Sequence, residues 1–162
     1  MQLAGAAAAG IPAFSRCSLN WADLFAHFFG SSDWAKPIHA EMLAAYRSAQ
    51  AFLRVTPGMA METLGNVQTV GTISAFGARH ELGLNAEKAI LIAMGGIAHR
   101  LPLEHWPRLP NVRWLVPADW NCQHPDALTI ESFGLSFTDL LCSVDAVITK
   151  PGYGTFTEAA GN

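Results

Sequence analysis

The residues best suited to chemistry stand at the end of the chain, where glycines follow a short apolar run. Residues 145–149 (DAVIT) include β-branched apolar side chains and predict a buried strand. Residues 150–154 (KPGYG) break that strand, because proline fixes one backbone angle and glycine tolerates positive φ. A helix is then expected to begin near Thr155, with Thr155 at the N-cap and Glu158 at position N3 of a capping box.

A strand, a glycine turn and a helix N-terminus together favour binding of an anion. The first N–H groups of a helix lack intrahelical partners and carry the positive end of its dipole, and glycine lets a phosphate approach the backbone. The spacing is neither that of a Walker nucleotide site nor that of a dinucleotide fingerprint. A plainer interpretation stays open: Gly152 and Gly154 only make a tight turn, and Glu158 only caps a helix.

A second glycine turn follows the apolar run at residues 89–94 (AILIAM), which predicts another buried strand. Gly95 and Gly96 end this run, as expected for the first turn of a nucleotide-binding half. A glycine pair alone is a weak signal, since any tight strand-to-helix turn would use one. Two such turns in one half make the combination more specific.

Residues 146–159 (AVITKPGYGTFTEA) resemble the donor-binding segment of GT-B glycosyltransferases. The closest branch contains the bacterial N-acetylglucosaminyltransferase of peptidoglycan synthesis and related predicted glycosyltransferases. In that family the turn and helix start hold the nucleotide diphosphate, and a Glu of the helix holds the ribose. Lys150-Pro151 departs from the small or Arg-Ser pair of some relatives, which leaves the phosphate geometry open.

The resemblance implies a set of nucleotide-sugar-binding residues when it is carried over by position. They are Gly95, Gly96, Phe133, Gly134, Gly152, Tyr153, Gly154, Thr155 and Glu158. Phe133 and Gly134 would receive the base, although Phe133 is equally well explained as ordinary core. The resemblance also implies a uridine-based nucleotide-diphosphate sugar as donor substrate, no separate cofactor, and transfer with inversion without an obligatory metal.

A base that deprotonates the acceptor of the sugar is expected within residues 18–29 (SLNWADLFAHFF). Asp23 and His27 are the candidate catalytic residues, because burial among aromatic side chains would tune their pKa values. The alternative is a half-buried helix capped by Asn20, and that interpretation is the stronger one for each residue taken singly.

Composition limits the classes of partner and the location that the sequence predicts. The net charge is −3 with no basic block, so the sequence does not indicate nucleic-acid binding. The longest apolar run is too short for a membrane span. Three widely separated cysteines favour free thiols and a cytoplasmic location, and the pair Cys122 and His124 lacks zinc spacing, so no metal site is predicted.

The fold class expected is α/β, with Rossmann-like parallel sheets, flanking helices and an incomplete GT-B architecture. Hydrophobic residues make up 51% of the chain and charged ones only 14%, which favours parallel strands buried on both faces. Residues 1–57 are expected to form the tail of an acceptor-side half and residues 58–88 a linker with a first short strand. Residues 89–162 would form an incomplete nucleotide-sugar-binding half, since family members continue for several more elements.

The function expected is that of a glycosyltransferase fragment, with weak or no turnover from this chain alone. A sugar-nucleotide epimerase of the same fold is one alternative, although it would need facing carboxylates and no clear pair is present. A non-catalytic binding module is the other. It would use the apolar excess for self-association into a homo-oligomer.

Overall fold

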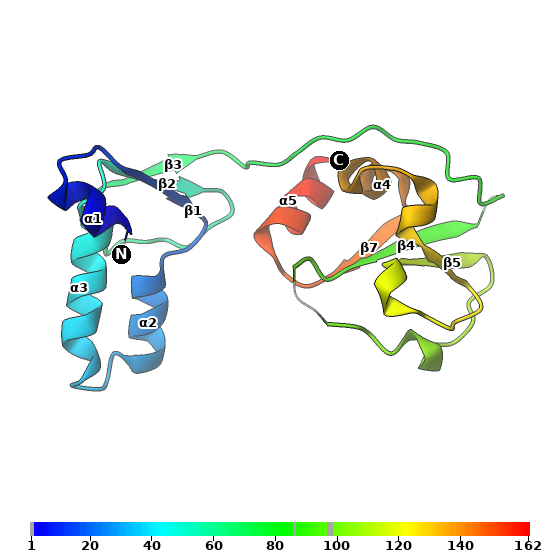
Figure 1. The fold of residues 1–162 in the computed structure, drawn as a ribbon, viewed down its shortest axis with the longest axis horizontal. Helices are drawn as coiled ribbons and strands as arrows, with labels where there is room; N and C mark the ends of the chain where they lie inside the picture. Colours follow the sequence, from blue (N-terminus) through cyan, green and yellow to red (C-terminus); the bar gives the residue numbers. More distant parts are fainter. Residues whose placement is uncertain (1, 86, 97–98) are drawn as a thin grey trace. The chain divides into compact units, whose positions relative to one another are not determined.

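The computed structural model describes residues 2–85, 87–96 and 99–162, and the chain divides into two compact units, Met1–Ile73 and Ser74–Asn162. Each unit is an α/β body of parallel strands with flanking helices, so the predicted Rossmann-like class is confirmed (Figure 1). Among the helices of the described residues, none is long and apolar enough to cross a membrane.

The first unit contains α1 (Gln2–Ala8), β1 (Phe14–Cys17), α2 (Trp21–Phe29), α3 (Ala35–Arg47), β2 (Ala51–Val55) and β3 (Val67–Val70). Its sheet has the order β1-β2-β3, and both strand pairs are parallel. The core joins Tyr46 of α3 to Phe52 of β2, whose rings lie 5.6 Å apart. The short strand at 67–70, predicted to lie with the linker, is thus the third strand of the first sheet.

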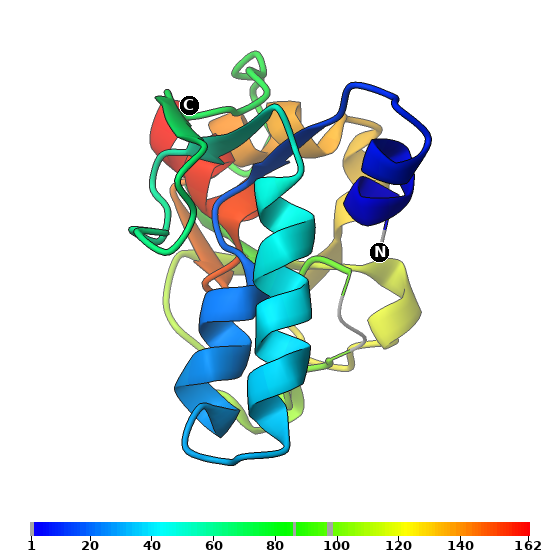
Figure 2. The ribbon, with the colours of Figure 1, turned by 90° about the vertical axis from the view of Figure 1, so that its left-hand side faces the viewer.

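The helices α2 and α3 lie side by side in the first unit (Figure 2). Asn20 caps α2, because its side-chain oxygen accepts the N–H of Asp23 at 2.8 Å. The outer face of α2 is apolar, with Trp21 62% and Phe28 71% exposed in the chain described. Self-association through this face stays a prediction.

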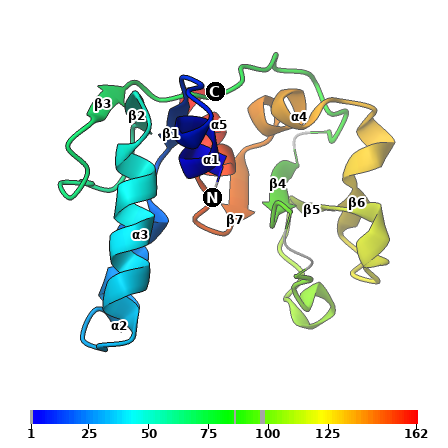
Figure 3. The ribbon, with the colours of Figure 1, turned by 60° about the vertical axis from the view of Figure 1, so that its left-hand side comes forward.

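The second unit contains β4 (Lys88–Ala93), η1 (Leu103–His105), β5 (Val112–Val116), η2 (Ala118–Trp120), β6 (Ala127–Thr129), η3 (Ile130–Phe133), α4 (Phe137–Ser143), β7 (Ala146–Thr149) and α5 (Tyr153–Gly161). Its strands follow the order β6-β5-β4-β7, and all three pairs are parallel (Figure 3). Ser136 is the N-cap of α4: Asp139 N–H donates to Ser136 Oγ, and Ser136 Oγ donates to the Asp139 carboxylate.

Strand β4 is buried on both of its faces, as its continuous apolar run predicts. Its alternate residues Ala89, Leu91 and Ala93 pack in the cluster that includes Leu140 and Leu141 of α4. The intervening Ile90 and Ile92 pack on the other face, in a cluster with Leu103, Trp114 and Val116. The two-sided core therefore fixes the centre of this sheet.

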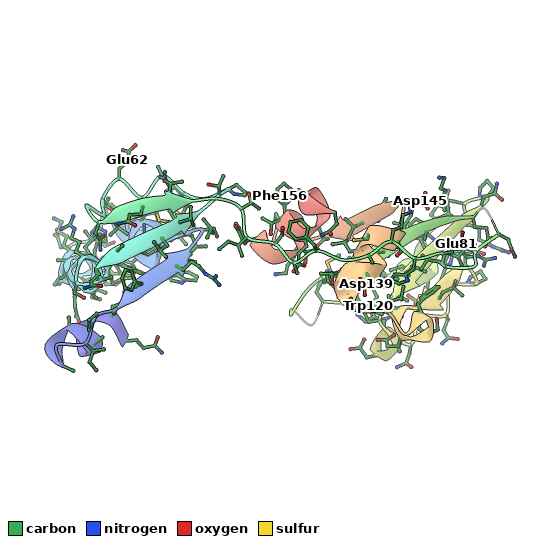
Figure 4. The ribbon with its side chains drawn as sticks, turned by 90° about the horizontal axis from the view of Figure 1, so that it is seen from above. Glu62, Glu81, Trp120, Asp139, Asp145 and Phe156 are labelled. Atoms are coloured by element: carbon green, nitrogen blue, oxygen red, sulfur yellow. The ribbon has the colours of Figure 1, made fainter. Side chains whose placement is uncertain are left out.

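Residues 74–80, which we call the strap, run along α4 and the C-terminal end of α5 (Figure 4). Three strap N–H groups donate to side chains: Gly77 to Asn162, Ala78 to Asp139, and His80 to Ser143. A Cβ at Gly77 would lie 2.4 Å from the backbone of Thr138, so the strap touches α4 directly. The strap is therefore an integral part of the second unit.

We expect Gly77→Ala to destabilise the second unit, because the added methyl would overlap the α4 backbone. Overpacking of this kind lowers the free energy of unfolding by about 1–3 kcal/mol. Urea unfolding followed by tryptophan fluorescence measures the change. Gly65→Ala is the control, since a Cβ there meets nothing within 4 Å. Equal stability of Gly77→Ala and the parent would show that the strap does not bear on the fold.

Candidate anion-binding site

Two glycine turns leave the second sheet side by side. Strand β4 pairs with β7 up to the partners Ala93 and Thr149. Gly95 and Gly96 follow the first of these strands, and Gly152 follows the second. Because parallel strands end at the same edge of a sheet, the two turns meet there. The structure thus brings together the two glycine segments that the sequence singled out.

The side chain of Lys150 lies between these turns. A Cβ built on Gly95 would lie 3.4 Å from Lys150 Cε, and one built on Gly152 would lie 3.4 Å from Lys150 Nζ. The half-buried ammonium forms no ion pair with any described residue. Gly95 also needs its positive φ of 60°, which L side chains rarely adopt. The Lys150 side chain therefore lies beside both glycines.

Helix α5 begins two residues before the position that the sequence predicted. Gly152 is the N-cap, with an extended backbone, and its carbonyl accepts the N–H of Phe156 at 3.1 Å. Thr155 is therefore at N3 and not at the N-cap, so the capping box of Thr155 with Glu158 is wrong. The reason is local: Gly152 has the extended backbone of an N-cap, and its carbonyl accepts the first hydrogen bond of the helix, so Tyr153 and Gly154 already belong to α5.

The first turn of α5 offers backbone donors. Its N-cap Gly152 has no side chain to cap it, and the turn contains no acidic residue. Among the described residues, none accepts a hydrogen bond from the N–H of Gly154 or Thr155. The N–H of Gly152 is occupied, since it donates to the carbonyl of Lys150 at 2.7 Å. Free amide hydrogens, a positive helix end and the Lys150 ammonium all favour an anion here.

Glu158 lies in the second turn of α5 rather than the first. Its side chain is half-buried, and no described residue forms an ion pair or a hydrogen bond with its carboxylate. Its backbone carbonyl accepts the side-chain amide of Asn162 at 2.7 Å. The carboxylate is therefore a hydrogen-bond acceptor that the fold itself does not use.

Phe133 and Gly134 follow β6, the strand at the other edge of the sheet. Phe133 is half-buried and packs against the cluster formed by Leu91, Leu115 and Leu140. Gly134 ends η3 with a φ of 62°. Both residues have structural explanations, and packing of Phe133 in the core is one of the two alternatives left open by the sequence.

Asp23 and His27 belong to the first unit, on α2. Asp23 accepts hydrogen bonds at both carboxylate oxygens, from Asn20 Nδ2 at 2.7 Å and from Thr63 Oγ1 at 2.5 Å. This pattern secures the start of α2 and ties it to the loop that follows β2. His27 is exposed, and its ring packs edge-on against Phe28 at 5.1 Å. His27 is thus the more exposed of the two candidates, and Asp23 is half-buried with both carboxylate oxygens hydrogen-bonded.

Carboxylates gather at the opposite, amino edge of the second sheet, where cations neutralise them. A hydrogen bond from Lys88 and one from the Ala89 N–H hold the pKa of Asp145 below its ordinary value. Paired hydrogen bonds from Arg108 likewise lower the pKa of Asp126, which is 6% exposed. Each of these carboxylates is thus neutralised by a cation of the same unit. The Lys150 ammonium at the carboxyl edge, in contrast, has no such partner among the described residues.

Comparison with known proteins gives no match: no family model, no curated protein and no solved structure matches this chain. The resemblance to GT-B enzymes therefore rests on the quoted motif alone. In the part of the chain that the structure describes, three or more His, Cys, Asp or Glu side chains nowhere gather as metal ligands would. Sequence reasoning missed Lys150, and its position directly after the strand was the signal that could have found it.

We expect the second unit to lose stability in acid, because folded-state pKa values lowered by pairing stabilise only the ionised form. The contribution is complete above the unfolded pKa of about 4 and is lost as the pH falls through the lower folded pKa. Urea unfolding at pH 7 and pH 3 measures this loss. Asp126→Asn should be less stable at pH 7 and should lose less on acidification.

Asp33→Asn serves as the control for this experiment, because Asp33 is 94% exposed and pairs only with Lys36. Its pH dependence should match that of the parent. An Asp126→Asn variant with an unchanged pH profile would show that the pair with Arg108 contributes nothing to acid unfolding.

Proposed function

We propose that the second unit binds a uridine-diphosphate sugar and that the chain belongs to a cytoplasmic glycosyltransferase. The observation that carries the proposal is the Lys150 ammonium, held without a carboxylate partner between two glycine turns at the start of α5. A diphosphate supplies the negative charge that this arrangement lacks. The free thiols of Cys17, Cys122 and Cys142 agree with a reducing compartment.

The diphosphate would lie over the first turn of α5. Its oxygens would accept the N–H groups of Gly154 and Thr155, and the Lys150 ammonium would neutralise part of its charge. Gly95 and Gly152 suit this contact because both lie beside the end of the Lys150 side chain and leave the backbone open to a phosphate. Glu158, whose carboxylate is unused in the described structure, would accept the ribose hydroxyls.

The reaction proposed is a single displacement at the anomeric carbon of the donor sugar. An acceptor hydroxyl oxygen forms the new bond to that carbon while the bond to the phosphate oxygen breaks, and uridine diphosphate leaves with the electron pair. A base takes the hydroxyl proton. Lys150 and the α5 amides would stabilise the charge that develops on the leaving diphosphate.

Lys150→Ala should weaken binding of uridine diphosphate, because the ammonium supplies a charged hydrogen bond to the phosphate. The loss of such a bond corresponds to about a 10- to 100-fold rise in Kd. Isothermal titration calorimetry on the 162-residue chain measures it. Lys88→Ala is the matched control, since Lys88 lies on the same unit at the opposite sheet edge. Absence of binding to the parent chain would sink the proposal.

Glu158→Ala should distinguish the ribose contact from the phosphate contact. Removal of the carboxylate should raise the Kd for uridine diphosphate about tenfold, as expected for a hydrogen bond to a charged group. The Kd for inorganic pyrophosphate should stay unchanged, because pyrophosphate has no ribose. Equal weakening of both ligands would assign Glu158 to the fold of α5 and remove it from the proposed site.

A further inference from the structure

The two ends of α5 are held in different ways. At its start the N-cap Gly152 provides no side-chain hydrogen bond, whereas Asn20 and Ser136 cap α2 and α4 with their side chains. Helices in proteins are stabilised mainly by tertiary packing. In the described structure, α5 packs through Ala159 against the core and is bonded to the strap at its C-terminal end.

The C-terminal end of α5 is tied to the strap by the side chain of Asn162. Its Nδ2 donates to the carbonyl of Glu158 at 2.7 Å and to the carbonyl of Ala75 at 2.9 Å. Its Oδ1 accepts the N–H of Gly77 at 2.9 Å. One amide thus joins the last turn of the helix to two residues of the strap.

The strap is in turn tied to α4. Ala78 N–H donates to Asp139 Oδ1 at 2.7 Å, and His80 N–H donates to Ser143 Oγ at 2.8 Å. Close backbone contact at Gly77 leaves no room for the strap to shift toward α4. Helix α4, the strap and the end of α5 therefore form one continuous array of hydrogen bonds.

We infer that the strap is a clamp that holds α5 from its C-terminal end and so keeps the uncapped first turn in place for its ligand. The inference rests on the proposed function for the identity of that ligand, a nucleoside diphosphate. Asn162 is a positioning residue in this scheme, because it acts on the site through α5. Thermodynamic linkage makes the effect reciprocal, so a ligand at the first turn also steadies the strap.

Amide hydrogen exchange of the chain, with and without uridine diphosphate, tests the clamp. In the free protein, Asn162→Ala should speed exchange of strap residues 77, 78 and 80 and of α5 residues 156–158 about five- to tenfold, as loss of one or two ordinary hydrogen bonds implies. Asn162→Asp keeps the acceptor for Gly77 but sets a carboxylate oxygen against the carbonyls of Glu158 and Ala75, so it should not restore the slow exchange of the parent. Ser74→Ala is the control, because this strap hydroxyl bonds no described residue, and its exchange should match the parent.

The change in amide exchange on adding uridine diphosphate separates a positioning role of Asn162 from a purely structural one. In the parent it should slow exchange at residues 154 and 155 and also in the strap, whereas in Asn162→Ala the slowing should stop within α5. Slowing confined to α5 in the parent would overturn the clamp and leave the proposed function standing. No slowing at residues 154 and 155 would overturn the proposed function, and the free-protein comparison would still decide for or against the clamp.

Discussion

The parallel pairing of β4 with β7 is the constraint on which the candidate site depends. Neither glycine turn makes an anion receptor alone, because each supplies only a sharp bend and room for a close approach. Their adjacency comes from hydrogen bonds between the two strands, which run to the partners Ala93 and Thr149. The pairing is secured by burial of β4 on both faces, so the two-sided core and the site share one cause.

Charge is distributed unevenly between the two edges of the second sheet. At the amino edge, the carboxylates of Asp126 and Asp145 meet arginine or lysine side chains within hydrogen-bond distance. At the carboxyl edge, the ammonium of Lys150 meets glycine backbone instead. The charges at the amino edge are paired within the fold, whereas among the described residues the Lys150 ammonium has no ion-pair partner.

The sequence was sufficient where the determining interactions are local. The apolar run at residues 89–94 predicted the buried strand β4, and the run at residues 145–149 predicted β7, which is half-buried at the edge of the sheet. It failed at α5, because the carbonyl of Gly152 already accepts the N–H of Phe156, so the helix starts before the predicted N-cap Thr155. It also failed to assign the short strand at 67–70 to a sheet, since four residues contain no information about their pairing partner.

Features created by tertiary contact lay beyond sequence reasoning for a further reason. The strap has no hydrophobic period, and its course is set by side chains of Asp139, Ser143 and Asn162 that are distant in the chain. The direction of the Lys150 side chain depends equally on the turn at Gly95, which is distant from it in the sequence. The resemblance supplied the expectation of a phosphate site, and the geometry supplied the cation.

The strap also changes where an autonomous folding domain would have to be excised from this protein. A cut made at the first strand, β4, looks natural on a topology diagram. It would remove the backbone donors that satisfy Asp139 and Ser143, and it would uncover the core that Leu82 and Leu84 help to close. Irregular chain ahead of the sheet thus contributes as much to the integrity of the domain as a regular element would.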